Sequence, residues 1–190
     1  YRALRSVEPA IKRFRYARDA VDSVPAQAAA TTANLTALLK AAPGKHVVGV
    51  MMTDTYGPAS QYIKSVKDWL YANDADQASL MKAARLTVLF SNVSFVGPNS
   101  LASRLKDFGT VNAPGGPKPY TENVFVSQVV PNYQHDNSDG IIEYRKLVEP
   151  TGAAPTFTSF EGYIAGRIFI EGLKNNRGAF TSANLIGAFE

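Results

Sequence analysis

Apolar segments of strand length alternate with longer segments of helical pattern through the first two thirds of this chain. The first apolar run, 46–52, is nearly continuous, which is typical of a strand covered on both faces. The runs at 86–90 and 124–130 have the same character. Strands that alternate with helices indicate βαβ units, so the sequence predicts an α/β fold built on a parallel sheet.

Helices are expected between these strands, where apolar residues recur at helical spacing. The segment 115–119 is expected to be a loop, and no strand pair is expected to be joined by a tight hairpin turn. A further strand of modest quality is expected at 9–16. The helices expected in this part of the chain are 25–40, 59–72, 76–85 and 101–106.

The pattern changes at Pro131. Strands and helices alternate before this residue, whereas the pattern after it is almost entirely helical. A polar segment at 131–139 leads into helices expected at 140–148, 159–175 and 182–190. The sequence therefore predicts two parts, residues 1–130 and residues 131–190.

A parallel sheet of this kind binds ligands beyond the carboxyl ends of its strands. The loops at 53–58 and 91–100 follow two of the expected strands and are the candidate binding loops. Tyr56 stands in the first loop beside Gly57 and Pro58. Two interpretations of Tyr56 are open, a wall of a binding pocket or an aromatic ring folded back onto the core.

Catalytic and metal-binding chemistry finds little support in the sequence. Cysteine is absent, which excludes a cysteine nucleophile and cysteine-ligated metals, and there are two histidines. His46 opens an apolar strand and is expected to be structural. His135 lies near Asp136 and Asp139, but neither the spacing nor a further ligand supports a metal site. No phosphate-binding loop or nucleophile elbow occurs, so neither an enzyme nor a cofactor is expected.

The charge pattern argues against a nucleic-acid-binding protein, and the length of the apolar runs argues against a membrane-spanning one. Twenty basic and sixteen acidic residues give a formal charge of +4, and the Lys and Arg are scattered. A nucleic-acid groove would require a basic patch interleaved with exposed aromatic residues. No run is long and apolar enough to cross a bilayer.

The sequence resembles the leucine/isoleucine/valine-binding family of ABC-transporter substrate-binding proteins, the type I periplasmic binding proteins. Each similar stretch is modest alone, but four of them occur in the family's order. They are Val47-Val48-Gly49-Val50 through Tyr56-Gly57-Pro58-Ala59, Phe90 to Gly97, Val126 to Pro131 with Glu143-Tyr144-Arg145, and Phe157 to Gly166.

The resemblance implies two α/β lobes, each a three-layer parallel-sheet lobe, joined by crossing strands with the ligand in the cleft between them. Residues 1–130 would be most of the second, C-terminal lobe. Residues 131–190 would return to the first lobe and supply helices there. The resemblance also implies that an N-terminal portion, including the first-lobe sheet and any signal peptide, is absent from this sequence, so helices after Pro131 would expose apolar faces.

The resemblance further implies six ligand-binding residues. Thr55 and Tyr56 would provide hydrogen bonds and an aromatic wall. Ser94, with Phe95 alongside, would occupy a position where amino-acid binders often place an acidic residue against the ligand ammonium. A neutral hydroxyl cannot supply that charge-assisted contact, so this departure weakens the case for an amino-acid ligand. Phe157 and Thr158 would approach the cleft from the returning segment.

The implied function is that of a periplasmic or lipid-anchored extracellular protein that captures a small polar solute, an amino acid or a small carboxylate or amide. Its partner would be the membrane permease of an ABC importer. One alternative is the same fold used as the ligand-sensing domain of a receptor or regulator. A more distant alternative is an α/β enzyme, which would need a nucleophile, metal or phosphate loop.

Overall fold

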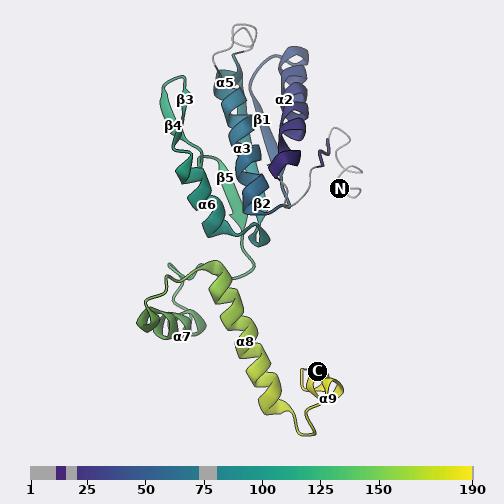
Figure 1. The fold of residues 1–190 in the computed structure, drawn as a ribbon, viewed down its shortest axis with the longest axis vertical. Helices are drawn as coiled ribbons and strands as arrows, with labels where there is room; N and C mark the ends of the chain where they lie inside the picture. Colours follow the sequence, from purple (N-terminus) through teal and green to yellow (C-terminus); the bar gives the residue numbers. More distant parts are fainter. Residues whose placement is uncertain (1–11, 16–20, 73–80, 190) are drawn as a thin grey trace. The chain divides into compact units, whose positions relative to one another are not determined.

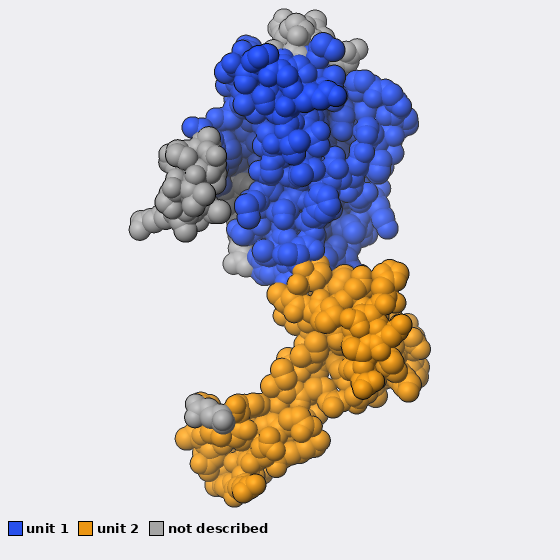
Figure 2. All heavy atoms as spheres, turned by 180° about the vertical axis from the view of Figure 1, so that it is seen from behind, with its two compact units in different colours: residues 1–127 blue, residues 128–190 orange. Residues whose placement is uncertain are grey.

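The computed structural model describes residues 12–15, 21–72 and 81–189. The chain divides into two compact units, Tyr1–Ser127 and Gln128–Glu190, shown in different colours in Figure 2. Assignment of these units to a second lobe and to a returning segment of the first lobe stays a prediction.

A three-stranded parallel sheet forms the centre of the first unit. Its strands are β1 (His46–Met51), β2 (Leu86–Val93) and β5 (Val124–Ser127), in the order β1-β2-β5. Met51 is in register with Ser91, and Val93 with Ser127, so the carboxyl ends of the strands lie at one edge. The predicted α/β class with a parallel sheet is confirmed.

Helices cover one face of this sheet. The three long ones, α2 (Val24–Ala41), α3 (Tyr56–Tyr71) and α6 (Pro98–Asp107), lie in the upper part of Figure 1. Right-handed crossovers that advance across a sheet in one direction place their helices on the same face. Buried residues from these helices form one core with Leu86, Val88 and Phe90 of β2. A single turn of helix, α5 (Lys82–Arg85), precedes β2.

The opposite face of the sheet is open among the described residues. Exposed and partly buried residues alternate along β1, and Val47 and Met51 are 71% and 76% exposed. Phe125 of β5 is 56% exposed on the same face. The prediction that the run 46–52 is buried on both faces is therefore wrong for this structure, because no described helix covers the second face.

Hydrogen bonds from polar side chains link the helices of the first unit to one another. The hydroxyl groups of Thr31 on α2 and Tyr62 on α3 lie 2.6 Å apart in a buried hydrogen bond. The Arg85 guanidinium donates to the carbonyls of Leu39 and Ala42, at the carboxyl end of α2. A cation at this end satisfies carbonyls that lack helical partners and complements the helix dipole.

A hairpin stands where the sequence predicted a loop. Strands β3 (Thr110–Ala113) and β4 (Gly116–Pro119) pair antiparallel, so the expectation of no tight hairpin is wrong. Pro114 and Gly115 occupy the turn, and Gly115 has φ +95°. Proline followed by a glycine with positive φ is the pattern of a type II turn. The ribbon tolerates Pro117 and Pro119 because it has two strands, each with one unpaired edge.

The other differences lie at element ends. Strand β2 continues to Val93, so Ser91 is strand rather than loop, and a 3-10 turn (Ser94–Val96) follows. Strand β5 ends at Ser127, three residues before the predicted end. The predicted strand 9–16 lies largely outside the described residues, and 12–15 have no regular structure. The first part of the predicted helix 76–85 also lies outside them.

The second unit consists of α7 (Asp139–Val148), α8 (Phe157–Asn175) and α9 (Ser182–Gly187). A small core of Tyr133, Ile141, Tyr144 and Phe160 joins α7 to the first turns of α8. Farther along α8, apolar side chains are exposed: Ile168 55%, Phe169 50% and Ile170 47%. In the described part of the chain, no helix has both the length and the apolar character to cross a membrane.

Candidate functional site

The residues predicted from the first two loops meet at the carboxyl edge of the parallel sheet. Thr55 precedes the first turn of α3, and Tyr56 is its first helical residue. Ser94 and Phe95 form the 3-10 turn that follows β2. Because β1 and β2 are adjacent and parallel, both segments emerge on the same side of the sheet.

Tyr56 lies between the second loop and α6. A Cβ atom built on Gly97 would lie 3.3 Å from Cδ1 of Tyr56, so the ring packs directly on the Gly97 backbone. The guanidinium of Arg104 lies 5.4 Å from the ring centroid, within cation–π range. The Tyr56 side chain remains 41% exposed. The ring therefore does not fold back into the core, and it presents an aromatic surface at the sheet edge.

The second loop contributes a further aromatic surface. Phe95 is 47% exposed, whereas Val96 beside it is buried in the core. Ser94 is half-buried, and its carbonyl accepts a hydrogen bond from the amide of Gly97 at 3.2 Å. Gly97 has φ +77°, a backbone conformation that is unfavourable for any residue with a Cβ atom. The turn at Gly97 thus ends the 3-10 turn and leads into α6 beside the Tyr56 ring.

A buried polar pair supports this edge, and sequence reasoning missed it. Asp54 and Asn92 are 4% and 3% exposed, and Asn92 Nδ2 donates to Asp54 Oδ1 at 2.5 Å. Asn92 Oδ1 accepts from the amide of Val93 at 2.8 Å. Burial raises the pKa of the Tyr62 phenol, the hydrogen bond with Thr31 lowers it, and the charge of Asp54 raises it. In the sequence, a polar residue at an inward position of an apolar strand was the available signal.

Phe157 and Thr158 belong to the second unit. They are the first two residues of α8, where Phe157 is partly buried and Thr158 is exposed. The Phe157 ring packs edge-on against Tyr133, with centroids 4.9 Å apart. Phe157 is thus held by its own unit. A shared site of these two residues with Thr55, Tyr56, Ser94 and Phe95 stays a prediction.

The histidines have the environments expected of structural or solvated residues. His46 Nε2 lies 3.1 Å from the carbonyl oxygen of Ala42, and His135 is exposed. In the described ranges, no group of three or more His, Cys, Asp or Glu is placed to hold a metal ion.

A cavity lies at the other edge of the sheet. It has a volume of about 860 Å³ and lies beside the amino-terminal residues of β2, between the end of α3 and the β3–β4 hairpin. None of the six predicted ligand-binding residues lines it. The carboxyl edge of the first unit is instead an open surface of aromatic and hydroxyl groups.

Comparison with known proteins supports the fold. No family model and no curated protein matches the sequence. Among solved structures, the chain is similar to the crystal structure of a possible leucine/isoleucine/valine-binding protein from Rhodopirellula baltica SH 1, with a TM-score of 0.64 and 23% identity. The match covers 100% of this chain and 42% of that one. The chain therefore shares the fold of less than half of that protein.

Proposed function

We propose that this chain is the ligand-binding part of an extracytoplasmic solute-binding protein that delivers its ligand to the permease of an ABC importer. The observation that carries the proposal is the extent of the structural likeness. Both units match a single chain described as a possible leucine/isoleucine/valine-binding protein, over all of the present sequence. A sheet lobe followed directly by a helical unit is the arrangement that the sequence resemblance implied.

In this proposal, the carboxyl edge of the first unit is one wall of the ligand cleft. Tyr56 and Phe95 cover the apolar part of the ligand, and Thr55 and Ser94 offer hydroxyl groups. Phe157 and Thr158 of the second unit are proposed to contribute to the same ligand site. The segment from Val129 to Pro131 follows β5 without regular secondary structure and is proposed as part of the hinge between the lobes.

The charges at this edge favour a carboxylate on the ligand. Arg104 is exposed and is held over the Tyr56 ring, where a carboxylate stacked beside the ring would reach the guanidinium. Ser94 supplies no negative charge for an ammonium group, and Asp54 is 4% exposed. We therefore propose a small carboxylate or amide as the ligand ahead of a simple amino acid. The protein captures this ligand and does not transform it.

Calorimetric titration of the full-length protein against amino acids, small carboxylates and amides tests the proposal. A ligand that binds is then titrated into Phe95→Ala and into Phe180→Ala as a matched control. Both phenyl groups are exposed, and Phe180 belongs to the second unit, where it is 81% exposed. We expect Phe95→Ala to weaken binding roughly tenfold and Phe180→Ala to leave it unchanged. Absence of binding across the panel by folded protein, or equal effects of the two substitutions, contradicts the proposal.

A further inference from the structure

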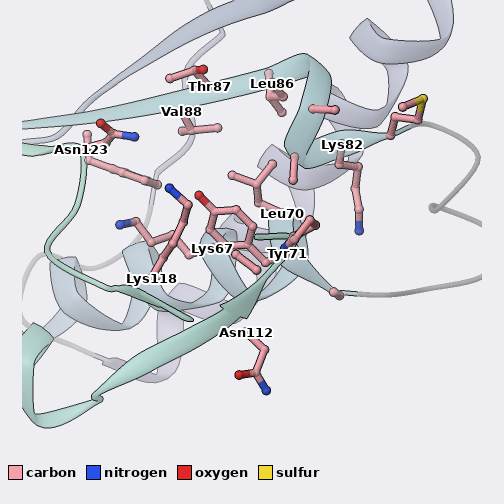
Figure 3. A pocket seen from close by; sticks show the side chains of 17 residues that line it. Lys67, Leu70, Tyr71, Lys82, Leu86, Thr87, Val88, Asn112, Lys118 and Asn123 are labelled. Carbon is pink, nitrogen blue, oxygen red and sulfur yellow. The ribbon is translucent and has the colours of Figure 1, made fainter. Parts of the chain in front are cut away.

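Among the residues that the structure describes, three lysines and no acidic residue line the cavity at the amino edge of the sheet. Lys67 comes from the last turns of α3, Lys82 from α5 and Lys118 from β4. The described lining residues include no Asp or Glu. In Figure 3 the side chains of Lys67, Tyr71 and Lys118 lie together, whereas Lys82 lies apart from them. Two of the three lysines therefore lie on the side of the cavity formed by α3 and the hairpin.

Lys67 is one of two buried cations in this lining, the other being Lys82. The Lys67 side chain is 4% exposed, and its ammonium donates to the carbonyls of Tyr120 at 2.8 Å and Glu122 at 2.5 Å. An ammonium group carries three N–H donors. In the described part of the chain, the third donor of Lys67 has no acceptor, and the residue lines the cavity.

The surrounding groups do not neutralise Lys67 fully. The Glu122 carboxylate pairs with Lys118 at 2.8 Å and is not part of the cavity lining. Burial lowers the pKa of Lys67 to about 8, the charge of Glu122 raises it and the charge of Lys118 lowers it. Burial also raises the pKa of Tyr71, which is a neutral hydroxyl donor at pH 7. A buried cation with an unused donor gains free energy from an anionic partner.

We propose that this cavity is a second binding site, distinct from the carboxyl edge, and that it takes a small oxyanion, either a phosphoryl group or a carboxylate. Lys67 contacts the anion through its third N–H, and Lys118, whose ammonium also pairs with Glu122, approaches it from the hairpin. Tyr71 and Asn123 lie within the same lining and offer neutral hydrogen-bond donors. Leu70, Leu86 and Val88 form an apolar wall that limits hydration of the site.

The site is suited to small anions rather than to polyanions. Its cations come from α3, α5 and β4, and two of them, Lys67 and Lys82, are each 4% exposed. A nucleic-acid backbone would instead need a series of exposed cations along a groove. The inference does not depend on the proposed transport function, because none of its residues belongs to the carboxyl edge.

Titration with inorganic phosphate and, separately, with acetate tests the site and distinguishes the two anion classes. Sodium chloride at matched ionic strength is the reference. The wild-type chain is compared with Lys118→Gln and with Lys106→Gln, a matched control on the exposed surface of α6 that does not line the cavity. We expect at least one of the two oxyanions to bind the wild type and Lys106→Gln with equal affinity. The same anion should bind Lys118→Gln roughly tenfold more weakly.

The titration of Lys67 itself gives a second measurement, followed by the NMR shift of ¹³Cε in lysine-labelled protein. An oxyanion beside the ammonium should raise its pKa above the value of about 8 set by burial, Glu122 and Lys118. The same measurement at matched chloride should leave it unchanged. Equal binding by the two variants, an effect of chloride equal to that of both oxyanions, or a Lys67 titration insensitive to phosphate and acetate would overturn the proposal.

Discussion

Asn92 of β2 donates a hydrogen bond from Nδ2 to Oδ1 of Asp54, the third residue after β1, across 2.5 Å in the interior of the first unit. This bond ties the carboxyl ends of two adjacent strands together beneath the loops that carry Tyr56 and Phe95. A buried carboxylate requires such partners, because loss of hydration would otherwise make its charge costly.

Asn92→Ala is expected to lower the free energy of unfolding by about 1–3 kcal/mol, because it removes a buried donor to a charged acceptor. Urea denaturation followed by the fluorescence of Trp69, the one tryptophan of the chain, measures this effect in the first unit. Asn99→Ala, at an exposed position in the first turn of α6, is the control and should change stability little. Equal stability of the two variants would contradict a structural role for the Asp54–Asn92 pair.

Gly97→Ala is expected to destabilise the first unit by about 1–2 kcal/mol, since φ +77° is unfavourable for a residue with a Cβ atom. The new methyl group would also lie 3.3 Å from the Tyr56 ring and displace it. Thermal denaturation measures the first effect, and the ring-proton NMR shifts of Tyr56 report the second. Gly166→Ala, in the interior of α8 with open space around it, should instead stabilise its helix. Unchanged Tyr56 shifts in Gly97→Ala would exclude the close packing.

Lys67 should make stability depend on pH above neutrality. Its folded-state pKa of about 8 is below the unfolded value of 10.5, so the unfolded chain binds more protons between these values. The contribution of Lys67 to the free energy of unfolding therefore rises as pH increases from 8 to 10.5. The neutral amine keeps two N–H donors for the carbonyls of Tyr120 and Glu122.

Comparison of the wild type with Lys67→Met over pH 7–10.5 isolates this contribution. The other titrating groups are common to both proteins, so their effects on stability largely cancel in the difference. We expect the wild type to gain on the order of 2–3 kcal/mol relative to the variant across this range. Lys106→Met, at an exposed position, should track the wild type. A constant difference between wild type and Lys67→Met at every pH would refute the lowered pKa.

Thr156→Ala is expected to lower the free energy of unfolding of the first turn of α8 by about 1 kcal/mol. The Thr156 hydroxyl accepts from the amide of Ser159 at 3.0 Å, and Ser159 Oγ accepts from the amide of Thr156 at 3.1 Å, which together form a capping box. Hydrogen exchange of the first-turn amides of α8 measures the loss. Thr158→Ala, two residues away and exposed, is the matched control. Similar exchange in both variants would show that the box contributes little.

Elements with strong local signals were predictable from the sequence. The apolar run at 46–52 became β1, and Pro25, near the start of the predicted helix 25–40, stands in the first turn of α2. The β3–β4 hairpin was missed because Pro117 and Pro119 argue against a strand unless each lies in a two-stranded ribbon. The burial of β1 was overestimated because an apolar run does not specify what covers each of its faces.

The candidate site was also predictable only in part from the sequence. Thr55, Tyr56, Ser94 and Phe95 could be named because they follow strands, and chain direction alone places strand ends at a common edge. The contacts of Tyr56 with Gly97 and Arg104 could not be named, since they join residues about 40 to 50 positions apart. The same holds for Lys67, whose acceptors at Tyr120 and Glu122 lie more than 50 residues away.

The sequence by itself determined the strands β1, β2 and β5, the long helices between them and the parallel sheet, because hydrophobic periodicity and turn residues act over a few positions. The tertiary structure decided which polar groups became buried. Asp54 and Lys67 look like ordinary surface residues in the sequence. Packing of α3 against the sheet and the hairpin buried both side chains. Asp54 therefore requires the hydrogen bond from Asn92 at the carboxyl edge, and Lys67 became a buried cation suited to bind an anion.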